Sequence, residues 1–343
     1  MSTRSPCLGQ RPCDACSPCM DSLIAGNRTY DDRHCWFRRP SVQRPSTVVG
    51  MGDSICYGIG DFGADWIGPS WVGRFAHAVQ ADRLVNLATP GQRAADVASH
   101  QLPAALLLKP TFALVSVGGN DLLRADFDPV SMWQHTQTVV RELTRSGTVV
   151  LVLGLPQVRA HDFLPRAVRA ALNERADLVN IALRAGVRVS EASLGSSAVG
   201  KSYFVDLWDD PNAADPRHWH IDRMHPSPNG HDYLARTACA LVRTGSLEAG
   251  LPISAIAEQP TRVRWLIRNG VPWLLRRSVD LIPQALMTLA FHQSHYRRMQ
   301  RRLLAAITSD QVDGYGMAVS PPSTINSWPV MNEDASLAKN TAA

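Results

Sequence analysis

Short apolar runs alternate with longer amphipathic stretches between residues 46 and 244. The short runs are rich in Val and Leu and predict β-strands. The predicted strands span 46–51, 83–87, 112–117, 148–153 and 203–207. The run at 148–153 is apolar almost throughout, which is typical of a strand covered on both faces of a sheet.

The stretches between these runs repeat their apolar residues at helical spacing. They predict helices at 71–80, 94–108, 130–146, 167–186 and 228–243. We expect Gly186 to end the fourth helix and Pro228 to occupy the first turn of the last. Strands that alternate with helices indicate a parallel sheet with right-handed crossovers, and therefore a three-layer α/β/α sandwich.

The pattern divides the chain into four parts. Residues 1–45 form a leader rich in Cys and Pro that we expect to be disordered, and 46–244 form the α/β domain. Residues 245–309 form a basic helical extension, and 310–343 are polar without periodicity, as in a disordered tail.

The composition is that of a globular protein. Of 343 residues, 45% are hydrophobic and 19% are charged, which excludes collagen-like and wholly disordered chains. The sequence shows neither a run of about 18–20 apolar residues nor a secretory signal, so we expect a cytoplasmic protein. A net charge of +5 is too small to indicate a nucleic-acid partner, and none is expected.

The basic excess is concentrated near the C-terminal end. Residues 262–302 contain nine arginines and one acid, Asp280, together with Trp265 and Trp273. One interpretation is a weak contact of segment 261–305 with an anionic membrane surface. The other is a helical appendage that packs its Trp and Leu against the domain, and Pro272 and Pro283 favour it because they interrupt a helix.

Five of the seven cysteines lie within the first 35 residues. Cys13, Cys16, Cys19 and Cys35 could offer four thiolates to zinc or an iron–sulfur cluster. The surrounding residues show no helical or strand period that would build a scaffold for such a site. We therefore expect no metal and no other cofactor.

Candidate chemistry lies just after the predicted strands, where ligands bind in parallel sheets. Ser54 follows the first strand, and Asp222 and His225 follow the last. A serine becomes a nucleophile when a histidine takes its proton, and an aspartate orients that histidine. The side chain of Asn120, after the third strand, and the backbone N–H groups of Ser54 and Gly91 could stabilise an oxyanion.

Several neighbouring residues have simpler interpretations. We expect Asp53 and Asp121 to accept backbone hydrogen bonds, His231 to be structural and Cys56 to be buried and inert. We expect His218 and Trp219 to line the mouth of a pocket.

Two motifs are misleading. Residues 58–63 match G-x-G-x-x-G, but Ser54 separates them from the strand and Asn86 stands near the end of the second strand, so a dinucleotide site is not predicted. His218, His220, Asp222 and His225 could be drawn as a metal site, but the Asp222–His225 pair is already explained by serine chemistry.

Four sequence blocks carry a family resemblance. They are Gly-Asp-Ser at 52–54, Asn-Leu-Ala-Thr-Pro-Gly at 86–91, Gly-Gly-Asn-Asp at 118–121 and Asp-Arg-Met-His-Pro-Ser-Pro-Asn-Gly-His at 222–231. In this order they resemble the SGNH-hydrolase family of GDSL-type esterases and lipases, over about residues 46–244. The departure is Ile55-Cys56-Tyr57, where the family commonly has Leu or Thr and then a small or acidic residue, so the wall of the pocket differs.

The resemblance implies a flavodoxin-like sheet and hydrolysis of a small-molecule carboxylic ester through an acyl-serine intermediate. It assigns Ser54 as nucleophile, His225 as base and Asp222 as its partner, with Gly91 and Asn120 completing the oxyanion hole. Acyl transfer and carbohydrate O-deacetylation would use the same residues and are alternatives. A non-catalytic membrane-surface binding module is a further alternative, which would not need all of these residues.

Overall fold

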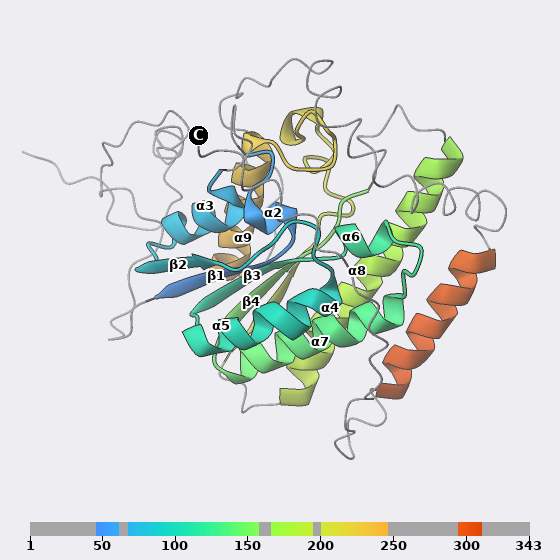
Figure 1. Cartoon of the computed structure of the whole chain (residues 1–343), viewed down its shortest axis with the longest axis horizontal. Coiled ribbons are helices and arrows are strands. Elements are labelled where there is room, and N and C mark those ends of the chain that lie inside the picture. Colours follow the sequence, from blue (N-terminus) through green and yellow to red (C-terminus); the bar gives the residue numbers. More distant parts are fainter. Residues whose placement is uncertain (1–45, 62–67, 158–165, 195–199, 246–293, 311–343) are drawn as a thin grey trace, which may run out of the picture.

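The computed structural model describes residues 46–61, 68–157, 166–194, 200–245 and 294–310. In this part of the chain a parallel sheet lies between two layers of helices (Figure 1). The five strands are β1 (Thr47–Gly52), β2 (Arg83–Asn86), β3 (Phe112–Ser116), β4 (Val149–Leu153) and β5 (Ser202–Val205). Their order, β2-β1-β3-β4-β5, is the flavodoxin-like order, so the predicted three-layer α/β/α fold is confirmed.

One face of the sheet is covered by α2 (Ser54–Tyr57), α3 (Ser70–Ala78) and α9 (Pro228–Thr244). Trp71 and Phe75 of α3 are fully buried in this layer against Val48 and Leu114 of the sheet. The last helix begins with Pro228 in its first turn, as predicted, and the Ser227 side chain caps it.

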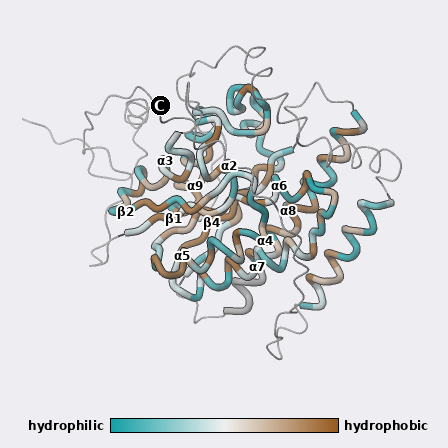
Figure 2. Tube along the Cα trace, viewed as in Figure 1, coloured by the Kyte–Doolittle hydropathy of each residue, from teal (hydrophilic) through white to brown (hydrophobic). Residues whose placement is uncertain are grey.

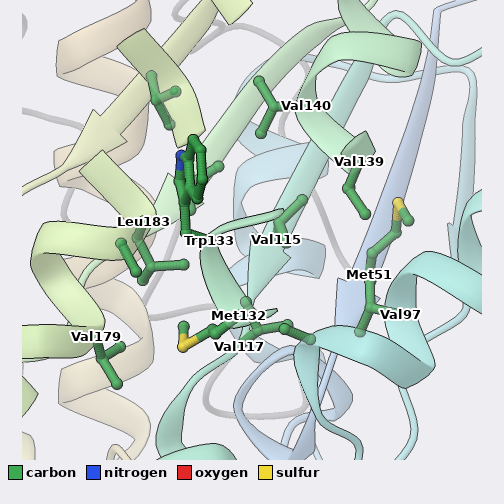
Figure 3. Close-up of a cluster of buried hydrophobic side chains, with 14 of the residues drawn as sticks. Met51, Val97, Val115, Val117, Met132, Trp133, Val139, Val140, Val179 and Leu183 are labelled. Atoms are coloured by element: carbon green, nitrogen blue, oxygen red, sulfur yellow. The ribbon is translucent and has the colours of Figure 1, made fainter. Parts of the chain in front are cut away.

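The other face is covered by α4 (Ala94–Asp96), the π-helix η2 (Val97–Gln101), α5 (Leu102–Leu108), α7 (Pro129–Arg145) and α8 (Arg166–Leu194). Figure 3 shows Met51 of the sheet beside Val97 of η2, and Trp133 of α7 beside Leu183 of α8. The strands β1, β3 and β4 are hydrophobic along most of their length (Figure 2), because both of their faces are buried, whereas the edge strand β2 is largely exposed. The short helices α6 (Gly119–Leu122) and η4 (Pro216–His218) follow strands β3 and β5.

The prediction that Gly186 ends the fourth helix is wrong. Helix α8 continues through this residue to Leu194. A Cβ atom on Gly186 would lie 3.1 Å from the backbone nitrogen of Gln137 and 3.1 Å from the Thr136 side chain, both on α7. The glycine therefore allows α7 and α8 to pack closely, which offsets its cost of about 0.5–1 kcal/mol inside a helix.

The predicted helix at 94–108 exists but is not uniform. The N–H of Leu102 donates to the carbonyl of Val97, which is the wider hydrogen-bonding step of a π-helix. Pro103 follows and has no N–H, so the regular α-helical ladder is interrupted at this point. The sequence periodicity did not reveal this irregular turn.

A helix at 294–310 packs beside α7 and α8 (Figure 1). Met299 and Leu303 are buried in the core, and the Tyr296 hydroxyl donates to Asp177 at 2.7 Å. Four arginines point to solvent: Arg297, Arg298, Arg301 and Arg302. In this part of the basic segment Met299 and Leu303 pack against the domain while Leu304 and the arginines are exposed.

Several predictions lie outside the described residues: the N-terminal cysteine cluster, Trp265, Trp273, the two interrupting prolines and most of the tail. The four-part division of the chain accordingly stays a prediction. Within the described part, no helix is both long and apolar enough to cross a membrane.

Candidate active site

Ser54 is the first residue of α2, directly after the end of β1. The preceding Asp53 is the N-cap of this helix, and its Oδ1 atom accepts hydrogen bonds from the Ile55 N–H at 3.0 Å and the Ser116 hydroxyl at 3.2 Å. The Asp53 N–H donates to the Ser116 carbonyl at 3.1 Å. These bonds fix the turn to β3, and they confirm the role predicted for Asp53.

The turn places the Ser54 hydroxyl against a histidine from the other end of the domain. Ser54 Oγ lies 2.8 Å from His225 Nε2, and His225 Nδ1 lies 2.7 Å from Asp222 Oδ2. The structure thus brings the three residues into one continuous hydrogen-bonded chain. The His225 side chain is 18% exposed and the Asp222 side chain only 9%, so this chain runs from the surface into the protein.

The loop that carries His225 is held by the same aspartate. Asp222 Oδ1 accepts the backbone N–H groups of Met224 at 2.9 Å and His225 at 3.0 Å. His220 donates its backbone N–H to the His225 carbonyl at 2.8 Å. One carboxylate therefore fixes both the backbone and the ring of the histidine, which limits the motion of the ring.

Burial and charge act in opposite directions on this pair. Burial alone would lower the pKa of His225, but the negative charge of Asp222 and the hydrogen bond to it raise that pKa above its usual value of 6.5. Burial likewise opposes ionisation of Asp222, but the two histidines beside it hold the pKa of this carboxyl far below its usual value of 3.8. The Asp222 carboxylate is therefore charged at neutral pH and favours the imidazolium form of His225.

The residues predicted for the oxyanion hole come from two further segments. The Asn120 side chain donates to the Gln92 carbonyl at 3.1 Å, which joins α6 to the loop that contains Gly91. The start of that loop is joined to β1, because the Thr89 N–H donates to the Gly52 carbonyl at 3.1 Å. The segments that contain Ser54, Gly91 and Asn120 are thus connected at the carboxyl edge of the sheet.

Asp121 supports the same junction. Its two carboxylate oxygens each lie 3.3 Å from the backbone nitrogen of Ala94, and Arg93 Nε lies 3.7 Å away. This confirms that Asp121 accepts a backbone hydrogen bond beside Asn120.

His231 and Cys56 have the structural roles that were predicted. His231 is fully buried; its Nδ1 accepts the Trp71 N–H and its Nε2 donates to the Ile59 carbonyl, both at 3.2 Å. Cys56 is fully buried in α2, and burial raises the pKa of its thiol, so a reactive thiolate is disfavoured.

The prediction that His218 lines a pocket mouth is wrong. Its side chain is only 4% exposed and stacks on the Tyr233 ring at 4.9 Å between centroids. Its Nδ1 lies 2.6 Å from the Asn212 carbonyl, and Trp219 donates its indole N–H to the Ala213 carbonyl at 2.8 Å. Both side chains anchor the loop that follows β5.

Gly60 of the glycine-rich motif contributes to packing around the site. Gly60 has φ of +90°, and a Cβ atom there would lie 2.4 Å from the Pro226 carbonyl oxygen and 3.1 Å from His225 Cβ. Gly60 therefore lets the chain after α2 pass close to the His225 loop. As for metals, no cluster of three or more His, Cys, Asp or Glu side chains suited to an ion occurs among the residues that the structure describes.

Two residues beside the site were not predicted. His220 Nδ1 lies 3.4 Å from Asp222 Oδ2, the atom that also bonds His225. Gln101 reaches the last residue of β1 from η2. A signal for Gln101 exists in the sequence, since it is a polar residue on the apolar face of the predicted 94–108 helix, at helical spacing from Val97 and Ala105.

The fold and this edge of the sheet define a class: a flavodoxin-like α/β protein with a hydrogen-bonded serine, histidine and aspartate beyond its strands. A model of the GDSL-like lipase/acylhydrolase family matches residues 51–233, more than half of the chain. The chain therefore belongs to this family. The match includes all five residues that were predicted to form the site.

Solved structures with a similar fold include three bacterial enzymes. A lipase/acylhydrolase from Enterococcus faecalis is 16% identical, with a TM-score of 0.45, and the match covers 60% of this chain and 100% of that one. The acetylxylan esterase Axe2 from Geobacillus stearothermophilus is 19% identical, with a TM-score of 0.43 and coverage of 60% and 97%. Phospholipase A1 from Streptomyces albidoflavus is 19% identical, with a TM-score of 0.39 and coverage of 56% and 97%. No curated protein sequence matches the chain.

Proposed function

We propose that this protein is a serine ester hydrolase that forms an acyl intermediate on Ser54. The observation that supports this most directly is the continuous hydrogen-bonded chain from Ser54 Oγ through His225 to Asp222. A non-catalytic binding module would have no need for a serine, histidine and aspartate in this geometry.

In the proposed reaction Ser54 Oγ attacks the carbonyl carbon of the ester while its proton passes to His225 Nε2. Asp222 stabilises the imidazolium that forms. The backbone N–H groups of Ser54 and Gly91 and the amide of Asn120 donate to the oxyanion. His225 then protonates the leaving alkoxide, and water that His225 activates hydrolyses the acyl-serine.

Hydrolysis of p-nitrophenyl acetate, butyrate and laurate by the wild type and by Ser54→Ala tests the proposal. The variant removes the nucleophile, so we expect kcat to fall on the order of 10³-fold or more for each ester that the wild type hydrolyses. Ser146→Ala is the matched control, because Ser146 caps the far end of α7 and its hydroxyl bonds only local groups. Turnover that persists in Ser54→Ala would contradict the proposal.

A reactive phosphonate ester gives an independent measurement. It should form a covalent adduct on Ser54, which peptide mass spectrometry locates, and His225→Ala should slow that labelling strongly. Adding alcohol acceptors to the reaction separates hydrolysis from acyl transfer, since a transferase yields the new ester only when an acceptor is present.

A further inference from the structure

The side chain of Gln101 makes a pair of hydrogen bonds to one residue of the sheet. Its Oε1 accepts the Gly52 N–H at 2.7 Å, and its Nε2 donates to the Gly52 carbonyl at 2.9 Å. The side chain is 5% exposed, so both bonds are sheltered from water. Gly52 is the last residue of β1 and lies two positions before Ser54.

This pair replaces a missing stretch of β-sheet. Strand β2 ends at Asn86, opposite Gly50, so β1 extends two residues beyond its neighbour. The Leu87 N–H still reaches the Gly50 carbonyl at 2.8 Å, but the chain then leaves the sheet. Without Gln101 the Gly52 N–H would be a buried donor with no strand to pair with on the side of β2, which costs about 1–3 kcal/mol.

Gln101 also connects the two halves of the site. The Gly52 carbonyl accepts both Gln101 Nε2 and the Thr89 N–H, which begins the loop leading to Gly91. Through this shared oxygen, the glutamine fixes the end of β1 relative to the loop from Thr89 to Gly91, called the oxyanion loop below. The N–H groups of Leu87 and Thr89 attach the start of this loop to β1. Gln101 lies in η2, farther along the chain, and attaches the segment after the loop to the same strand.

We propose that Gln101 is a positioning residue for ester hydrolysis, which sets the Gly52–Ser54 turn relative to the oxyanion loop. This rests on the proposed function. The role needs a planar group with a donor and an acceptor side by side, which a primary amide provides and an ionised carboxylate or an alkyl side chain does not. Because it acts through Gly52 and Thr89, its loss should change kcat rather than substrate binding.

Gln101→Leu removes both hydrogen bonds at similar volume. We expect kcat to fall about 10- to 100-fold, with KM changed less than about threefold, since small displacements of a nucleophile have effects of this size. Gln137→Leu is the matched control: Gln137 is also a buried glutamine on this side of the sheet, and its Nε2 donates to Asp310 at 2.8 Å, away from Ser54. The control should lower thermal stability and keep the wild-type kcat.

Gln101→Glu supplies a signature that lost packing does not produce. A neutral carboxyl can still donate to the Gly52 carbonyl and accept its N–H, whereas the ionised form cannot donate. The ratio of its kcat to that of the wild type should therefore decrease at least about tenfold from pH 5.5 to 8.5, as the buried glutamate ionises. If Gln101→Leu fails to fold, the pH dependence of this ratio tests the positioning role on its own.

A folded Gln101→Leu with kcat within twofold of the wild type, or a Gln101→Glu ratio that is flat with pH, would overturn the positioning role while Ser54-dependent hydrolysis persists. If wild-type hydrolysis does not depend on Ser54, the proposed function fails first, and the positioning role fails with it. The Ser54→Ala measurement separates these two cases.

Discussion

Asp53 places a second carboxyl near His225, in addition to its hydrogen-bonded partner Asp222. Burial raises the pKa of Asp53 to about 6, despite the hydrogen bonds from Ile55 and Ser116 that favour its charged form. Its charge raises the pKa of His225 in turn. The titrations of Asp53 and His225 are therefore coupled in the pH range in which His225, as the proposed base, would lose its proton.

Asp53→Asn should move the acidic limb of the kcat/KM profile to lower pH. Removing the negative charge lowers the pKa of His225, so the neutral, basic form persists in more acidic solution. Asparagine can still accept the Ile55 N–H as a helix cap. The profile is measured with p-nitrophenyl acetate, and Asp128→Asn, which changes the equivalent cap of α7, should leave the limb in place. A limb that moves to higher pH would contradict the coupling.

His231 should make the fold sensitive to acid. Burial lowers its pKa to about 4, against 6.5 for an ordinary histidine, so the unfolded chain binds the proton more tightly. The neutral His231 contributes fully to the free energy of unfolding above pH 6.5. As the pH falls towards 4 this contribution, on the order of 3 kcal/mol, is lost. Urea titrations between pH 4 and 7.5 measure this slope.

In that experiment His231→Gln should flatten the dependence on pH, whereas His100→Gln, at an exposed position in η2, should keep the wild-type slope. A slope that is the same in wild type and His231→Gln would show that other groups cause the acid sensitivity.

At this scale the sequence predicted the residues that end strands and missed those that meet only in space. Ser54, Asn120 and His225 were recognisable because the carboxyl ends of parallel strands share one edge. Gln101 contacts a residue 49 positions away through its side chain, and His220 joins Asp222 through the shape of an irregular loop. Neither contact follows from local periodicity.

At the scale of elements, the presence of a helix or strand was easier to predict than its end or an irregular turn within it. All five strands and the longer helices correspond to runs with clear periodicity, whereas the short helices α2 and α6 do not. Gly186 was misread because a glycine that ends a helix and a glycine that allows two helices to approach look identical in sequence. The packing of α7 on α8 decides between them, and that contact is not local.

The helix at 294–310 should be held mainly by its apolar face. Leu303 is fully buried, so Leu303→Ala is expected to lower the free energy of unfolding by about 2–4 kcal/mol. Arg301→Ala, two positions away on the exposed face, should change it by less than about 0.5 kcal/mol. Urea denaturation of both variants measures the difference. Equal effects would mean that the arginine face takes part in packing.

At the scale of the whole molecule, the distribution of charge over the surface is the relevant property. Arg297, Arg298, Arg301 and Arg302 form an exposed basic face on a chain of net charge +5. If this face meets an anionic membrane surface, as one interpretation of the sequence holds, the contact should be weak and sensitive to salt.

Sedimentation with vesicles of phosphatidylserine and phosphatidylcholine tests that interpretation. We expect binding at about 20 mM salt that largely disappears at about 500 mM, because the Debye length falls several-fold. Replacing the four arginines with glutamine should weaken it, and pure phosphatidylcholine vesicles should bind neither protein. Equal sedimentation with both kinds of vesicle would contradict an electrostatic contact.

Ser54 and His225 are 171 positions apart in the chain, yet they share one hydrogen bond. After Ser54 has been synthesised, more than half of the domain must still be translated before His225 is added to the chain. In the proposed hydrolase, a fragment that stops short of residue 225 lacks the histidine that would activate Ser54, and its serine is then an ordinary alcohol. A nascent chain would therefore gain the proposed esterase activity only when nearly the whole domain has been synthesised.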